Sequence, residues 1–127
     1  MATRSRIGME MPNGKVKSIY CHWDGYPEGV GATLQEHYTN LEKVEALIAL
    51  GDISSLSRCV SVNIPGVTHT FDNPDPDVTV AYHRDRGEKI LAPSIDPDVR
   101  NFAKSFYEQY AYVFTQQGEW KTFSLKD

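Results

Sequence analysis

The tripeptide Pro-Asn-Gly at positions 12–14 constrains the fold of this chain more than any other feature. Asn-Gly between two apolar segments is the strongest short-range signal for a β-hairpin turn. Before the turn, apolar and polar residues alternate over positions 5–10, as in a strand with one buried face. Residues 15–23 are typical of the returning strand. The sequence therefore predicts an antiparallel hairpin in the N-terminal part of the chain.

The register of this hairpin depends on the length of its turn. A two-residue turn places Glu10 opposite Lys17, which is a favourable cross-strand charge pair. That register puts Tyr20 on the same face as Ile7. A three-residue turn instead places Ile7 opposite Ile19. Aromatic side chains fall on both faces in either register, so we expect both faces of the sheet to be largely covered.

The rest of the chain predicts further short elements. Asn40 is a typical residue for the start of a helix, and Gly51 is typical of a helix end. Asp96 followed by Pro97 has the pattern of a helix N-cap. The predicted elements are helices over 29–38 and 40–50, strands over 59–64 and 78–84, a loop over 65–77, a helix after Asp96, and a hairpin over 110–114 and 120–123. The order β-β-α-α-β-β-α-β-β predicts a single α+β domain, residues 1–127, in which an antiparallel sheet has its helices packed on one face.

Composition excludes several classes of protein. The chain has 127 residues, a formal net charge of -4 and a pI of about 5.5, which argues against a nucleic-acid-binding protein because such proteins carry a strongly basic face. No apolar run approaches the roughly 18 residues of a membrane span, and residues 1–6 lack the apolar stretch of a signal peptide. We therefore expect a cytoplasmic protein without membrane contact, with Cys21 and Cys59 as reduced thiols.

Residues 20–30 hold three aromatic side chains together with a His, an Asp and a Cys. Solvated loops are seldom this rich in side chains that are costly to expose, so the segment forms either the edge of a core or a recognition surface. Tyr20, Trp23 and Tyr26 have the chemistry to stack on a planar base. A structural role, with His22 bonded to a neighbour, is the plainer interpretation.

The same segment does not form a complete catalytic set. Cys21 and His22 point to opposite faces of a strand and cannot act as a dyad. His22 and Asp24 would share a face only if the strand continued, but Gly25 ends it. Together with His83 they lack the spacing of a metal site. The sequence therefore predicts no metal and no cofactor.

Two segments have the chemistry of an anion site. The backbone amides at residues 29–31 start a predicted helix, where they can hold a phosphate, although the glycines are equally suited to a plain turn. Arg84 and Arg86 can clamp an anion together with Arg4 or Arg6, or can form a solvated salt-bridged turn. We predict one ligand-binding site that is formed by Arg6, Tyr20, His22, Trp23, Asp24, Tyr26, Arg84 and Arg86.

Four blocks of sequence resemble a group of small uncharacterised proteins that tailed bacteriophages and prophages encode. The blocks are Arg-Ser-Arg-Ile-Gly at 4–8, Tyr-Cys-His-Trp-Asp-Gly-Tyr at 20–26 with Gly-Val-Gly at 29–31, Leu-Gly-Asp-Ile-Ser at 50–54, and Ala-Tyr-His-Arg-Asp-Arg-Gly-Glu at 81–88. The resemblance covers about the first ninety residues in separated blocks and brings no established activity. It implies an accessory phage protein in the cytoplasm of the bacterial host, and proteins of that kind usually act by binding.

These observations predict a binding protein that blocks a host factor, including a defence factor, or that sequesters a small anionic ligand such as a nucleotide. The expected partners are accordingly a host protein or a small phosphorylated ligand, and a homo-oligomer is a further expectation. One alternative is a small nucleotide-processing hydrolase that uses His22 and Asp24. Another alternative is a component of the phage particle or of its assembly.

Overall fold

Strands and short helices alternate along the chain. The computed structural model describes residues 3–62, 65–66, 68–90 and 93–124. The elements, of which η1 is a single π-helical turn, are β1 (Ser5–Glu10), β2 (Val16–Cys21), η1 (Pro27–Gly31), α1 (Ala32–His37), α2 (Leu41–Ala49), β3 (Ile53–Ser55), β4 (Val80–Ala81), α3 (Tyr82–Arg86), β5 (Ser94–Asp96), α4 (Val99–Ser105), β6 (Tyr110–Phe114) and β7 (Trp120–Ser124).

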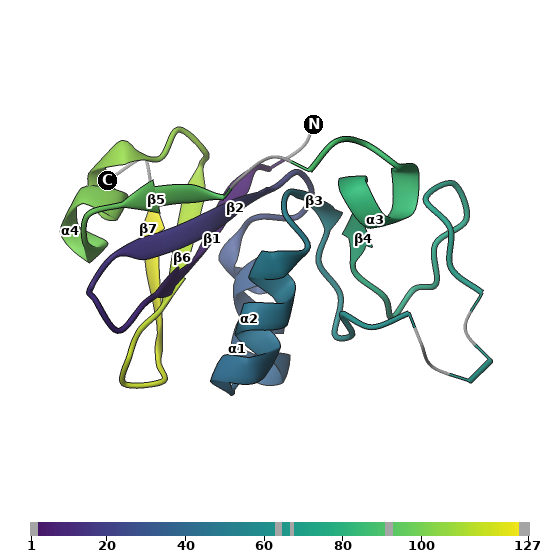
Figure 1. The fold of residues 1–127 in the computed structure, drawn as a ribbon, viewed down its shortest axis with the longest axis horizontal. Coiled ribbons are helices and arrows are strands. Elements are labelled where there is room, and N and C mark those ends of the chain that lie inside the picture. Colours follow the sequence, from purple (N-terminus) through teal and green to yellow (C-terminus); the bar gives the residue numbers. More distant parts are fainter. Residues whose placement is uncertain (1–2, 63–64, 67, 91–92, 125–127) are drawn as a thin grey trace.

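The strands form one mixed sheet in the order β4-β3-β2-β1-β6-β7, while β5 pairs with the first half of β2 (Figure 1). The pairs β1–β6 and β2–β3 are parallel, and the other pairs are antiparallel. The α+β class is confirmed, but the expectation of a purely antiparallel sheet is wrong. The reason lies in the connections, because η1, α1 and α2 bring the chain back so that β3 runs in the direction of β2.

The hairpin of β1 and β2 adopts the register of a three-residue turn. Ile7 lies opposite Ile19. The amide of Met11 donates to the carbonyl of Lys15 at 2.8 Å, and Gly14 has a φ of 85°, the left-handed conformation that closes such a turn. The alternative with Glu10 opposite Lys17 is wrong, and Tyr20 therefore does not share the face of Ile7.

Helices cover both faces of the sheet, which corrects the expectation that they lie on one face. The larger core places residues of α1 and α2 against Ile7, Ile19 and Tyr112. On the opposite face, Phe102 of α4 packs in a second, smaller cluster. A Cβ atom at Gly8 would lie 3.3 Å from the Phe102 ring, so a glycine at this position allows the ring to approach the strand closely.

Residues 78–84 do not form the strand that the sequence predicts. They contribute only β4, at the end of the sheet, and the first turns of α3. The carboxylate of Asp85 accepts a hydrogen bond from the amide of Ala81 at 2.8 Å, and Gly87 ends α3 with a φ of 73°. This local side-chain bond to the backbone competes with strand pairing, and it explains why a helix forms where the sequence predicts a strand.

The strand expected over residues 59–64 is reduced to one bridge between Cys59 and Val78, and residues 63–64 lie outside the described residues.

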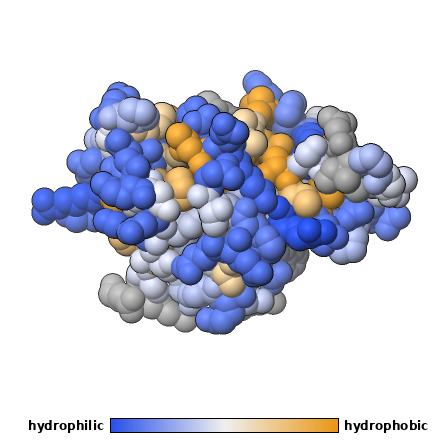
Figure 2. All heavy atoms as spheres, turned by 90° about the horizontal axis from the view of Figure 1, so that it is seen from below, coloured by the Kyte–Doolittle hydropathy of each residue, from blue (hydrophilic) through white to orange (hydrophobic). Residues whose placement is uncertain are grey.

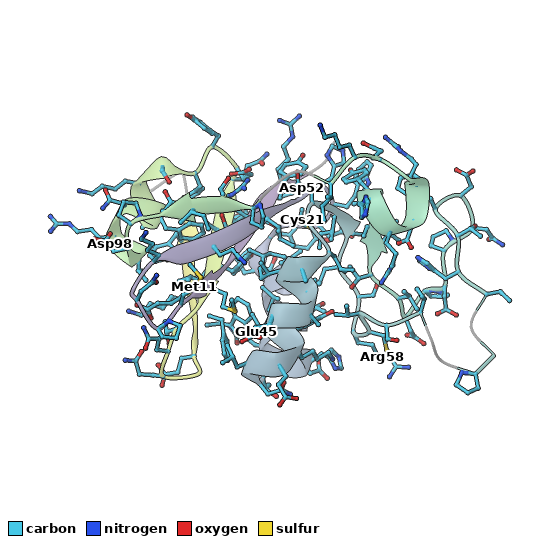
Figure 3. All side chains as sticks on the ribbon, viewed as in Figure 1. Met11, Cys21, Glu45, Asp52, Arg58 and Asp98 are labelled. Carbon is cyan, nitrogen blue, oxygen red and sulfur yellow. The ribbon has the colours of Figure 1, made fainter. Side chains whose placement is uncertain are left out.

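Several other predicted elements agree with the structure. The helix over 29–38, the helix capped by Asn40 and the hairpin of β6 and β7 are confirmed. The cap of α4 is Asp98 rather than Asp96, because the Asp98 carboxylate accepts the amide of Asn101 at 2.8 Å (Figure 3). The observed element order therefore differs from the predicted order in the middle of the chain.

Candidate functional site

The segment that follows β2, residues 22–28, is a tight turn that we name the aromatic turn. The amide of Trp23 donates to the carbonyl of Ser54 at 2.9 Å, and the amide of Gly25 donates to the carbonyl of Thr3 at 2.8 Å. Asp24 is the single non-glycine residue with a positive φ, 57°, among the described residues. These backbone bonds fix the turn to β3 on one side and to the N-terminal segment on the other.

Tyr112 supports the aromatic turn from inside the protein. Its hydroxyl donates a buried hydrogen bond to the carbonyl of Gly25 at 2.6 Å. A Cβ atom at Gly31 would lie 3.1 Å from the Tyr112 ring, so the helix start also packs closely on this side chain. The amide of Val30 closes the turn by donating to the carbonyl of Asp24 at 2.8 Å. Backbone hydrogen bonds therefore fix both ends of the turn, and the Tyr112 side chain supports it from the interior of the protein.

Two aromatic side chains of the turn face solvent although the backbone beneath them is fixed. Trp23 is 46% exposed and Tyr26 is 37% exposed. The ring of His22 meets the Trp23 ring edge-on, with 4.7 Å between the ring centroids. The hydroxyl of Tyr26 donates to the Asp24 carboxylate at 3.3 Å, and the negative charge of Asp24 raises the pKa of Tyr26, with a smaller contribution from Glu28. The exposed surface of the turn is therefore aromatic and acidic.

Tyr20 and His22 lie directly beside the turn. The Tyr20 hydroxyl and Nδ1 of His22 are 2.7 Å apart and share a hydrogen bond. Burial raises the pKa of Tyr20, so it is a neutral phenol at neutral pH. Its backbone amide donates to the Asp52 carboxylate at 3.0 Å, which ties the end of β2 to the start of β3 (Figure 3). His22 is thus bonded to a neighbour, as the plainer interpretation of this segment expects.

Arg6 lies opposite Tyr20 in the hairpin, but protein groups occupy its guanidinium. Its nitrogens donate to Ser18 Oγ at 2.9 Å, to Ser94 Oγ at 2.8 Å and to the Glu108 carboxylate at 3.2 Å. The side chains of Arg6 and Glu108 are only 16% and 9% exposed. Arg6 therefore joins β1, β2, β5 and the segment before β6, and it is not an open anion-binding group.

Arg84 belongs to a separate cluster around α3. Its guanidinium donates to the Asp85 carboxylate and to the carbonyls of Thr79 and Val60. The Asp85 carboxylate also lies 2.9 Å from Nε2 of His69, whose side chain is 1% exposed. The sequence did not reveal this role of His69, because the residue lies in a proline-rich loop that has no periodicity.

Arg86 is also occupied. It forms an ion pair with Glu88, and its guanidinium lies 4.7 Å from the centroid of the Phe71 ring and 5.3 Å from that of Tyr82. Within the described residues, no hydrogen bond, ion pair or ring contact joins Arg84 or Arg86 to the aromatic turn. The structure thus brings together one part of the predicted site, namely Arg6, Tyr20, His22, Trp23, Asp24 and Tyr26.

The start of η1 differs from the expected anion site because its amides are used within the turn. The amides of Gly29 and Gly31 donate to the carbonyl of Tyr26, at 2.9 and 3.5 Å, and that of Val30 donates to Asp24. A Cβ atom at Gly29 would lie 2.4 Å from the Asp24 carbonyl oxygen. The glycines therefore serve close backbone packing, and the prediction that these amides are free is wrong.

The geometry does not assemble a catalytic pair. His22 and Asp24 bond to different tyrosines, Tyr20 and Tyr26, and no hydrogen bond joins them in the described part of the chain. Burial raises the pKa of the Cys21 thiol to about 12, so it is not a nucleophile at neutral pH. No group of three or more His, Cys, Asp or Glu in the described ranges has the arrangement to hold a metal ion.

Comparisons with known proteins return no match: no family model, no curated protein and no solved structure resembles this chain significantly. Among the described residues, none of the helices has the length and apolar character needed to cross a membrane.

Proposed function

We propose that this chain is a phage-type accessory binding protein that engages a host protein through the aromatic turn. The observation that carries the proposal is the exposure of Trp23 and Tyr26 on a backbone that hydrogen bonds hold in place. Large aromatic rings provide much contact area for little loss of side-chain entropy, and tryptophan and tyrosine dominate the energetics of protein interfaces. A fixed backbone lowers the cost of binding further.

The charges around the turn define the chemistry of the partner. Asp24 and Glu28 are both exposed, and both act on the Tyr26 hydroxyl. An arginine or lysine of the partner would stack on the Trp23 or Tyr26 ring while it pairs with these carboxylates. The proposed partner is therefore a host protein that presents a basic side chain to this surface.

The occupied arginines favour a protein partner over a small phosphorylated ligand. The guanidinium groups of Arg6 and Arg84 already have largely buried carboxylate partners, and displacing one of these to bind a phosphate is costly. The phage context, the bacterial cytoplasm as the site of action and a role against host defence rest on the resemblance of the sequence blocks, three of which contribute residues to the turn or its surroundings.

The test is affinity capture from bacterial lysate with the immobilised protein, followed by binding measurements on the purified partner. We expect Trp23→Ala to abolish capture of the partner, whereas Tyr107→Ala should not, since Tyr107 is an aromatic residue that is 92% exposed outside the turn. The variants Asp24→Asn and Glu28→Gln remove charge while Asn still tolerates the positive φ. They should slow association and weaken its dependence on salt.

Two results would contradict the proposal. One is a Trp23→Ala variant that captures the same proteins in the same amounts as the native chain. The other is tight binding of a phosphorylated ligand, so calorimetry with nucleotides and cyclic dinucleotides is the second arm. If no member binds more tightly than about 1 mM, corresponding to roughly -4 kcal/mol, the phosphorylated-ligand version is dropped.

A further inference from the structure

A pocket of about 340 Å³ lies at the far end of β2 from the aromatic turn. Its lining comes from the tips of the β1–β2 and β6–β7 hairpins and from the start of α2. The ribbon of these segments lies on the lower side of the molecule in Figure 1. Figure 2, which views the protein from below, shows a mainly hydrophilic surface with hydrophobic atoms exposed in small separate patches. The volume falls within the range of about 300–1,000 Å³ that is typical of small-molecule sites.

The apolar walls of this pocket continue the main core to the surface. Met9 and Phe114 are core residues, 8% and 4% exposed. Met11, which Figure 3 places between the hairpins and α2, is partly buried, and Leu41 is 49% exposed. Two methionines can adapt their shape to a guest, and an apolar guest gains free energy by covering exposed carbon.

Hydrogen bonds between the two hairpins hold the pocket open in one shape. The amide of Gln116 donates to Oε1 of Glu10 at 3.0 Å, and its side-chain Nε2 donates to the carbonyl of Met11 at 2.7 Å. On the opposite wall, the side chain of Asn40 accepts the amide of Lys43 at 2.9 Å and caps α2. A ligand would therefore enter a preformed site, and its binding would not have to order a flexible segment.

Charge determines which guest fits. Among the residues that the structure describes, Glu10 is the single charged one that lines the pocket. Its Oε1 bonds to Gln116, whereas its Oε2 makes no hydrogen bond or ion pair with any residue that the structure describes. A cationic group would find a partner there, and an anionic group would meet a like charge without any compensating cation.

We propose that this pocket binds a small amphipathic amine. The apolar body of the ligand covers Met9, Met11, Leu41 and Phe114, and its ammonium group lies at Oε2 of Glu10. The site is independent of the aromatic turn, because the two lie at opposite ends of β2 and share no residue. A ligand at this site would give the protein a second binding function.

The experiment compares three probes that share one ring: 2-phenylethylamine, 2-phenylethanol and 3-phenylpropanoate. Their binding is followed by the chemical shifts of backbone amides in ¹H–¹⁵N spectra. We expect the amine to shift the amides of Met11, Leu41 and Gln116 in a saturable manner, with a dissociation constant below about 1 mM. The alcohol should bind several-fold more weakly, and the carboxylate should show no saturable shifts.

Variants separate the two parts of the site. Glu10→Gln keeps an oxygen for the Gln116 amide but removes the charge, so the affinity for the amine should fall about tenfold and approach that for the alcohol. Leu41→Ala should weaken the amine and the alcohol alike. Glu45→Gln, an exposed glutamate on α2 that does not line the pocket, is the matched control and should change neither affinity.

The inference is overturned if none of the three probes gives saturable shifts, or if the carboxylate binds as tightly as the amine. It is also overturned if Glu10→Gln leaves the preference for the amine intact. Since none of these variants touches the aromatic turn, capture of the host protein should be the same in all of them, so the two proposals fail independently.

Discussion

The hydroxyl of Tyr112 in β6 donates a 2.6 Å hydrogen bond to the backbone carbonyl of Gly25, a residue 87 positions earlier in the chain. The bond is buried and joins the aromatic turn to β6. A turn that presents exposed aromatic rings is thereby coupled to one of the most buried side chains of the core.

Removing this hydroxyl tests how strongly the core supports the turn. Tyr112→Phe leaves the Gly25 carbonyl buried without a partner, and we expect the free energy of unfolding to fall by about 1–3 kcal/mol. The measurement is urea denaturation followed by circular dichroism. Tyr110→Phe is the matched control, because the Tyr110 hydroxyl makes no hydrogen bond within the described residues, and it should cost little. Equal losses for both variants would show that the bond contributes nothing specific.

The close approach of α4 to the sheet depends on the absence of a side chain at Gly8. A Cβ atom there would lie 2.9 Å from Val16 Cγ1 and 3.3 Å from Phe102 Cζ. We expect Gly8→Ala to lower the free energy of unfolding by about 1–3 kcal/mol through overpacking. Adding Phe102→Leu to Gly8→Ala should cost less than the sum of the two single changes, and strict additivity would contradict the steric explanation.

The cluster around Asp85 predicts a pH dependence of stability. Burial alone would raise the pKa of Asp85, but hydrogen bonds from Arg84, from the Ala81 amide and from His69 outweigh it and lower the pKa to about 2. Because the folded-state pKa lies below the ordinary value of 3.8, the carboxylate stabilises the fold above that pH. This stabilisation, about 2 kcal/mol, is lost as the pH falls from about 5 towards 2.

The measurement for Asp85 is the free energy of unfolding as a function of pH for the native chain and for Asp85→Asn. The difference between the two curves should shrink steadily below about pH 5 as the native carboxylate becomes protonated. The exposed Asp72 offers a control, and Asp72→Asn should leave the curve parallel to that of the native chain. A difference that stays constant down to pH 2 would mean that folding does not lower the pKa of Asp85.

The two cysteines should differ in their reaction with an alkylating agent. Cys21 is fully buried with its pKa raised to about 12, whereas Cys59 is partly exposed. We expect iodoacetamide at neutral pH to label Cys59 in the folded protein and to label Cys21 only on unfolding. Mass spectrometry of peptides from the labelled protein gives the two rates. Comparable rates without denaturant would contradict the buried position of Cys21.

The sequence could predict the elements whose signals are local. The Asn-Gly turn at positions 13–14, the Asn40 cap and the β-branched and aromatic strand β6 each depend on neighbouring residues, and each is found in the structure. The parallel pairing of β1 with β6 has no such signal, because it joins residues more than a hundred positions apart. The strand predicted over residues 78–84 is shortened to β4, because the Asp85 carboxylate accepts the Ala81 amide at the start of α3.

The same distinction holds for the candidate site. The aromatic turn could be recognised because its side chains are expensive to expose, and Tyr20 and His22 meet within one strand end. The engagement of Arg6 by Glu108 could not be foreseen, since the two residues are 102 positions apart. The sequence allowed Arg84 and Arg86 either to clamp a ligand or to form a salt-bridged turn, and the folded chain supplies each of the three arginines with its own carboxylate.

The central position of β1 has a consequence for how the protein is made. β1 leaves the ribosome before the other strands of the sheet, yet one of its two edges remains bare until residues 110–114 have been translated. Bare strand edges recruit other chains, and pairings between distant segments form slowly. The nascent hairpin is therefore exposed while the residues between β2 and β6 are translated, and we expect the yield of native protein to depend on chaperones that shield this edge until β6 arrives.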